Sequence, residues 1–127
     1  MSFAFSPRSG PILVGAEVSG PKGKTEAKLI LDTGATNTTL RVALLQALGY
    51  DLSEPIDQIH LTAGFGSARV PRLMLNRLTA LGRHAIGLRV VAHDLPPEAG
   101  VDGLLGLDFF RDLSITIDFR AGRITLA

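Results

Sequence analysis

The sequence predicts an all-β fold with one or two short helices, and two observations carry this prediction. Short segments rich in Val, Ile, Leu and Thr follow one another along the chain, separated by Gly and Pro. Near the end, Ile115, Ile117 and Phe119 alternate with polar residues, which is the period-two pattern of a strand with one buried face. We expect the 127 residues to form one domain, because they suffice for one core but not for two.

The first half of the chain predicts a hairpin and a helix. Strands are expected over residues 12–19 and 26–32, joined by a Gly- and Pro-containing turn over residues 20–24. Residues 42–48 are rich in helix formers, and Gly49 follows them as a C-terminal stop.

The middle of the chain predicts a second hairpin. Residues 56–63 and 68–76 are expected to be its two arms, with the Gly-Phe-Gly-Ser segment 64–67 at the tip. A further strand is expected over residues 83–93, followed by a loop over residues 95–100.

The last part predicts a short helix and a closing hairpin. The helix is expected over residues 107–113 and a strand over residues 114–119. Residues 120–123 form a turn, and residues 124–126 run back along the strand.

Composition and charge exclude several classes of function. The formal net charge is +1, with Lys and Arg spread along the chain, so we expect no nucleic-acid partner and no anionic membrane surface. The absence of Cys excludes disulfides, thiolate chemistry and Cys-based zinc sites. With neither a secretory signal nor a membrane-spanning stretch, the sequence predicts a cytoplasmic domain, although a fragment of a larger protein would look the same.

Residues 29–35, Leu-Ile-Leu-Asp-Thr-Gly-Ala, form the most informative motif. The apolar strand is expected to direct the Asp32 carboxylate toward the interior, where its charge needs a partner, and the strand ends at once in a small-residue turn. Such a turn could hold Asp32 beside a second carboxylate with one proton between them, the pairing that activates water for hydrolysis. An ordinary Asp-containing turn is the alternative interpretation.

A second motif lies about seventy residues further on, where two large apolar residues precede Gly106 and a short helix. This unit can pack behind the turn that bears Asp32. Two acids flank it, and we expect Asp102 to belong to an Asp-Gly turn and Asp108 to cap or brace the helix.

With both motifs in their order, the chain resembles the retropepsin-like aspartic proteases over roughly residues 12–119. In that family an apolar strand ends in Asp-Thr-Gly-Ala, a Gly-containing hairpin flap follows, and a hydrophobic–hydrophobic–Gly segment precedes a short helix. The resemblance implies a closed-barrel-like acid-protease fold and an aspartic endopeptidase without metal or organic cofactor. Because the chain has one Asp-Thr-Gly and the reaction needs two carboxylates, it also implies a homodimer that binds a peptide or protein substrate.

The resemblance also assigns roles to residues. The catalytic group would be Asp32, Thr33 and Gly34. The peptide would be lined by two segments, namely Ala35, Thr36 and Asn37 after the acid and Gly64, Phe65 and Gly66 at the hairpin tip. Structural support would come from Leu104, Leu105, Gly106 and Asp108.

The chain departs from the viral members of the family in two places. They usually carry two acids where this chain has Thr36 and Asn37, and an Arg that pairs with the first acid where this chain has Leu107. Loss of both partners leaves no unpaired buried charge, but viral substrate preferences do not transfer. A non-catalytic binding or dimerisation module and a self-processing domain remain alternatives on the same fold.

Other signals have ordinary interpretations. Residues 23–25, Gly-Lys-Thr, look like the end of a phosphate-binding loop, but Val18 replaces the required upstream Gly. The histidines are scattered along the chain and form no metal-binding motif.

Overall fold

The computed structural model describes residues 1–8, 10–63 and 66–127. The strands are β1 (Ser2–Ala4), β2 (Leu13–Gly20), β3 (Gly23–Leu31), β4 (Thr39–Leu40), β5 (Asp57–Ala63), β6 (Gly66–Met74), β7 (Arg77–Ala80), β8 (Arg83–Ala85), β9 (Arg89–Ala92), β10 (Gly103–Leu105), β11 (Ile115–Asp118) and β12 (Arg123–Leu126). The helices are α1 (Val42–Ala47) and two short 3-10 helices, η1 (Pro97–Ala99) and η2 (Leu107–Phe110).

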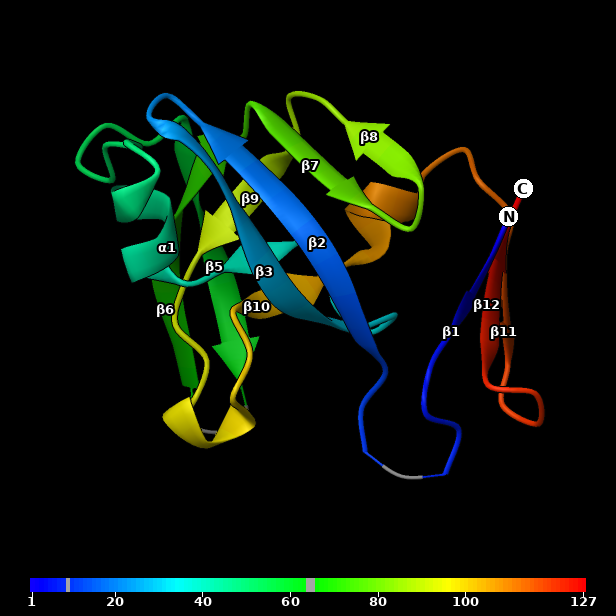
Figure 1. Cartoon of the computed structure of the whole chain (residues 1–127). Helices are drawn as coiled ribbons and strands as arrows, with labels where there is room; N and C mark the ends of the chain where they lie inside the picture. Colours follow the sequence, from blue (N-terminus) through cyan, green and yellow to red (C-terminus); the bar gives the residue numbers. More distant parts are fainter. Residues whose placement is uncertain (9, 64–65) are drawn as a thin grey trace.

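The described strands form two sheets (Figure 1). The main sheet has the order β5-β6-β9-β4-β10-β3-β2-β7-β8 and curls into a half barrel. The terminal sheet has the order β1-β12-β11 and stands beside it, carrying both ends of the chain (Figure 1). The loop between β3 and β4 extends toward the terminal sheet (Figure 1).

The hairpin β2–β3 confirms the strand prediction for the first half of the chain. Its antiparallel register runs from Leu13 opposite Ile30 to Gly20 opposite Gly23, which makes the turn shorter than the predicted five residues. Alternate residues such as Val14 and Leu29 are buried on the core side, as a strand with one buried face requires.

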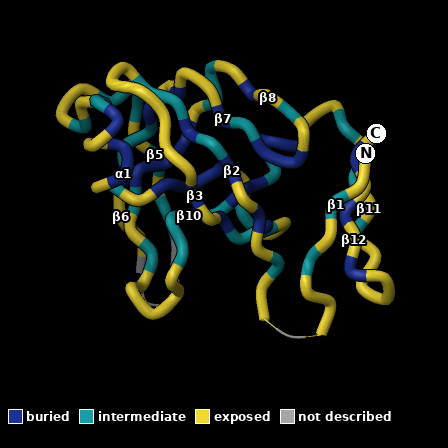
Figure 2. The backbone as a smooth tube through the Cα atoms, viewed as in Figure 1, coloured by how far each residue is buried: buried dark blue, intermediate teal, exposed yellow. Residues whose placement is uncertain are grey.

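The helix α1 follows the predicted boundaries closely. It packs Leu44 and Leu45 into the core, and Gly49 follows it with φ of +92°, a conformation that L side chains rarely adopt. The buried stretches of the chain run through the centre of the molecule along β2, β3 and β7, while the loops around them are exposed (Figure 2).

The single strand predicted over residues 83–93 is wrong, because the structure divides it into β8 and β9. Gly87 has φ of +72°, and its N–H donates to the Leu75 carbonyl at 3.0 Å, so the chain turns there instead of continuing. The preceding arm, predicted over residues 68–76, has the predicted length but is displaced by two residues, since β6 begins at Gly66. It ends at Met74, and β7 follows as a strand that the sequence pattern did not reveal.

The short helix after the second motif is also shorter than predicted, since η2 ends at Phe110 and not at residue 113. Arg111 is extended, with ψ of 140°, and Asp112 has φ of +66°. These two residues break the helical path and lead the chain into the terminal sheet.

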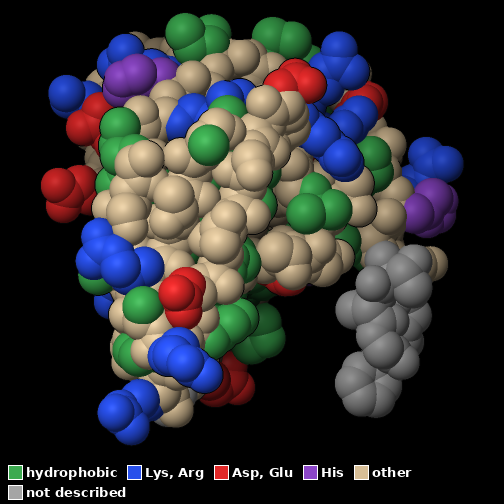
Figure 3. Space-filling model, turned by 90° about the vertical axis from the view of Figure 1, so that its right-hand side faces the viewer, with side chains coloured by type: hydrophobic (Ala, Val, Ile, Leu, Met, Phe, Trp, Pro, Cys, Tyr) green, Lys and Arg blue, Asp and Glu red, His purple; other side chains and the backbone are tan. Residues whose placement is uncertain are grey.

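The terminal sheet contains β1, a strand that the sequence analysis did not predict. Phe3 and Ile117 both lie opposite Ile124 in the register, so these apolar residues share one face. Ser2 lies opposite Thr125, and both are exposed on the other face. On the side of the molecule that carries this sheet, acidic and basic side chains are intermixed (Figure 3).

The main core includes Phe109 and Leu105 from the second motif, both fully buried. The motif is thus anchored in the same core as Leu29 of β3. Among the described residues, no helix combines the length and apolar character needed to cross a bilayer; a cytoplasmic location stays a prediction from the sequence.

Candidate active site

Asp32 directly follows the last residue of β3 and continues its hydrogen-bond ladder. Its N–H donates to the Leu105 carbonyl at 3.0 Å. Its side-chain oxygen Oδ1 accepts a hydrogen bond from the Gly34 N–H at 2.9 Å, and its carbonyl accepts one from the Ala35 N–H at 3.1 Å. One backbone donor, the Gly34 N–H, therefore holds the carboxylate, and the other two bonds hold the main chain of the turn.

The expectation that the strand drives this carboxylate into the interior is wrong for the single chain, in which Asp32 is half-exposed. Successive strand residues point to opposite faces, and Leu29 and Leu31 occupy the core face. Asp32 therefore shares the opposite face with Ile30. Thr33 and Gly34 are exposed beside it.

The two sequence motifs lie side by side, because β10 pairs in parallel with β3. Leu104 is opposite Ile30, and Leu105 is opposite Leu31. Leu105 is fully buried beneath the turn, whereas Leu104 and Ile30 are half-exposed on the same face as Asp32. Ile30 and Leu104 thus form an apolar floor on this face, next to the strand end that carries Asp32.

Gly106 lies directly against the segment that follows the acid. A Cβ atom built on Gly106 would come within 2.7 Å of the Asn37 carbonyl carbon and 2.8 Å of the Ala35 carbonyl oxygen. Two backbone hydrogen bonds hold the same segment, from the Leu107 N–H to the Ala35 carbonyl at 2.8 Å and from the Asp108 N–H to the Thr36 carbonyl at 3.2 Å. Only glycine permits this close contact.

Asp108 braces the same segment through Thr38. Its carboxylate accepts the Thr38 N–H at 2.9 Å and the Thr38 hydroxyl at 2.7 Å. The Thr38 hydroxyl oxygen in turn accepts the Gly106 N–H at 3.1 Å, and Thr38 is fully buried. The buried hydroxyl is thus satisfied as donor and acceptor. The flanking Asp102 instead accepts bonds from the Lys28 N–H and the Arg41 guanidinium.

An Asp108→Ala variant is expected to lose about 1–3 kcal/mol of unfolding free energy, because it leaves the buried Thr38 donors without an acceptor. Asp108→Asn keeps one carbonyl oxygen for Thr38 and is expected to lose less. Urea unfolding of both variants measures the difference. Equal stability of the alanine variant and the unmodified protein would contradict a stabilising role of the Asp108–Thr38 hydrogen bonds.

The hairpin β5–β6 is where the resemblance places the flap. Gly64 and Phe65 lie outside the described residues, and Gly66 opens β6 opposite Ala63. At the base of the hairpin, Arg72 Nε donates to Asp57 Oδ1 at 2.8 Å, and Nη2 donates to Oδ2.

The ion pair at the hairpin base perturbs both of its members. The hydrogen bonds from Arg72 hold the pKa of Asp57 below its ordinary value. The bonds to Asp57 raise the pKa of Arg72, and the charge of Asp108 adds to this effect. Arg72 Nη1 also approaches Asn37 Oδ1 at 3.4 Å.

Sequence reasoning missed some residues of this face. Ile30 could have been found, because it precedes Asp32 by two residues and so shares its face. Arg72 and Asp57 gave no local signal, since their pairing depends on the register of two strands.

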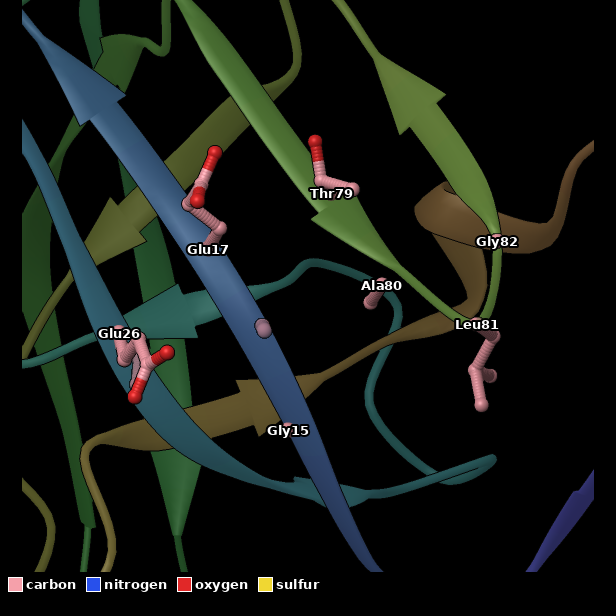
Figure 4. A pocket seen from close by; sticks show the side chains of 9 residues that line it. Gly15, Glu17, Glu26, Thr79, Ala80, Leu81 and Gly82 are labelled. Carbon is pink, nitrogen blue, oxygen red and sulfur yellow. The ribbon is translucent and has the colours of Figure 1, made fainter.

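A shallow hollow of about 390 Å³ lies elsewhere, on the outer face of β2, β3 and β7 (Figure 4). Its lining includes Glu17 and Glu26 and not Asp32. These two acids stand opposite each other in the β2–β3 register, and Lys24 pairs with Glu17 at 3.7 Å. Within the described ranges, no cluster of three or more His, Cys, Asp or Glu side chains is placed to hold a metal ion.

Comparison with protein families matches residues 14–109 to a model described as aspartyl protease. The chain belongs to this family. The matched residues include both the Asp32 motif and the motif that ends in Gly106. A search of the curated proteins gives no significant match.

Among solved structures, this chain is similar to a retropepsin-like aspartic protease from Rickettsia conorii, with a TM-score of 0.72 and 22% sequence identity. The match covers 99% of this chain and 88% of that chain. At this level of identity the likeness concerns the fold, and the fold is retropepsin-like.

Proposed function

We propose that the protein is an aspartic endopeptidase whose active site forms between two copies of the chain. The observation that carries this proposal is the half-exposed Asp32 carboxylate, fixed by the Gly34 N–H at the edge of an apolar floor. One chain supplies one such carboxylate, and water activation in this class of enzyme needs two.

In this mechanism the two Asp32 carboxylates share a proton and titrate as a coupled pair. The ionised carboxylate takes a proton from the attacking water, and the protonated one donates a hydrogen bond to the scissile carbonyl. The roles reverse when the amine leaves.

The homodimer follows from the same requirement. Thr33 and Gly34 are exposed at the tip of the turn, where a second turn related by a two-fold axis can meet them. Thr33 hydroxyls bonding across the interface would join the two turns into one platform.

The substrate in this proposal is an extended peptide that binds as an added strand. Its side chains contact the apolar floor of Ile30 and Leu104, and its backbone runs along Ala35, Thr36 and Asn37. The hairpin tip, with Gly64, Phe65 and Gly66, closes over the peptide.

The direct test is cleavage of an unfolded protein or a peptide library, followed by mass spectrometry of the products. We expect internal peptide bonds to be cut and a statine-type transition-state mimic to block the reaction. Binding of peptides without cleavage would contradict the peptidase and favour a binding module on the same fold.

Specific activity is expected to fall when the protein is diluted, because each active site needs two chains. The dissociation constant of the dimer, measured by analytical ultracentrifugation, sets the concentration at which half of the activity is lost. Constant specific activity far below that concentration would contradict a site shared between two chains.

A further inference from the structure

Arg72 connects the base of the hairpin β5–β6 to the segment that follows Asp32. Its guanidinium binds Asp57 through Nε and Nη2, and its third nitrogen, Nη1, lies 3.4 Å from Asn37 Oδ1. The Arg72 side chain, which belongs to β6, thus contacts the other arm of the hairpin, β5, and the predicted peptide-binding segment.

The sheet register explains why these three residues meet. Asp57 lies directly opposite Arg72, so their side chains share a face. On its other side, Arg72 lies opposite Val91, whose N–H donates to the Thr38 carbonyl at 2.9 Å. The strand β9 therefore brings Arg72 over the residues that follow the Asp32 turn.

The ion pair is partly shielded from solvent on the Arg72 side and open to solvent on the Asp57 side. The Arg72 side chain is 19% exposed and that of Asp57 is 40% exposed. Two parallel N–H···O bonds to one carboxylate fix the plane of the guanidinium, which a Lys could not do. Asp57 also feels the charge of Arg89, and Arg72 that of Asp108, so both partners lie among opposite charges.

Asn37, the residue that Arg72 Nη1 approaches, lies in a segment held by other contacts. Its backbone packs against Gly106, and its neighbours Thr36 and Thr38 are hydrogen-bonded to Asp108. Arg72 therefore links the hairpin to the hydrogen-bonded segment that follows Asp32.

We propose that Arg72 is a positioning residue of the site, which holds the hairpin at a fixed distance above Asn37 and so sets the space in which the peptide strand binds. This inference rests on the proposed peptidase function. Loss of the link affects substrate binding more than the chemical step, because other contacts fix Asp32 itself.

Steady-state kinetics on a peptide substrate tests the proposal. Arg72→Met is expected to raise KM by about tenfold and to change kcat by less than about twofold, since an interaction used in binding is removed. Arg72→Lys keeps the positive charge but cannot donate two parallel hydrogen bonds to Asp57, and its KM is expected to lie between those of the unmodified protein and Arg72→Met.

Arg41→Met is the matched control. It breaks another Arg–Asp pair, in which Arg41 Nε donates to Asp102 Oδ1 at 2.7 Å, beside the start of α1. If Arg72 has a purely structural role, Arg72→Met and Arg41→Met either both keep the KM of the unmodified protein or both change KM by the same factor. Either result would overturn the proposal.

Hydrogen exchange provides a readout that does not need activity. Amides of residues 57–63 and 66–74 are expected to exchange faster in Arg72→Met than in Arg41→Met. Equal protection in both variants would overturn the link between hairpin and turn. An unmodified protein without peptidase activity would overturn the proposed function, and the exchange comparison would still decide whether Arg72 restrains the hairpin.

Discussion

An Asp32→Asn variant is expected to fold and to assemble like the unmodified protein, and to lose at least about 10³-fold of its peptidase activity. The amide is nearly isosteric with the carboxylate, and its oxygen can still accept the Gly34 N–H, which holds Oδ1 at 2.9 Å. It cannot ionise or share a proton with its symmetry mate, so no group remains to activate water.

Circular dichroism and sedimentation check the fold and the assembly of this variant, and product analysis checks its activity. Asp112→Asn is a matched control, because Asp112 is exposed and its φ of +66° is one that Asn tolerates. Peptide cleavage by the Asp32→Asn variant at the unmodified rate would refute the proposed function.

A mixture extends the same experiment. Excess Asp32→Asn chains added to unmodified chains are expected to lower the activity, because mixed dimers contain one carboxylate. An activity that depends only on the amount of unmodified chain would show that the chains do not share a site.

A Gly106→Ala variant is expected to have the second large effect, this time on folding. Its methyl group would lie within 2.8 Å of the Ala35 carbonyl oxygen and of the Asn37 carbonyl group. The segment cannot move away without breaking the hydrogen bonds that its Ala35 and Thr36 carbonyls accept from the residues after Gly106. Such overpacking costs about 1–3 kcal/mol or more, a large part of the stability of a small domain.

Urea unfolding measures this loss, and Gly15→Ala provides the control. A Cβ atom built on Gly15 meets nothing within 4 Å, and glycine in a strand is entropically costly, so this variant is expected to be as stable as the unmodified protein or slightly more so. Equal stability of the two alanine variants would contradict the close contact at Gly106.

Local patterns were sufficient to predict much of this fold. The hairpin β2–β3 and the helix α1 follow from apolar periodicity and from glycines at their ends. The sequence analysis expected the second motif to pack behind the Asp32 turn, and in the structure Leu104 pairs with Ile30.

The remaining features depend on contacts between distant parts of the chain. β1 is three residues long and forms only against β12, so its own sequence carries no strand signal. The turn at Gly87 divides a segment whose apolar pattern predicts one strand. Glycine forms this turn through its positive φ, and it leaves no polar residue in the sequence pattern to mark the break.

The candidate site shows the same division. The position of Asp32 at a strand end was readable, but its half-exposed state follows from which face of β3 meets the core. The contact of Arg72 with Asp57 and Asn37 joins residues 15 and 35 positions apart, and only the assembled sheet brings them together.

Calorimetric titration with a statine-type transition-state mimic tests the central claim most directly, because such a molecule occupies the space between the two acids. If two Asp32 side chains meet across a symmetry axis, the titration gives one bound inhibitor per pair of chains, and Asp32→Asn removes the binding. A stoichiometry of one inhibitor for each chain would contradict a site built from two copies.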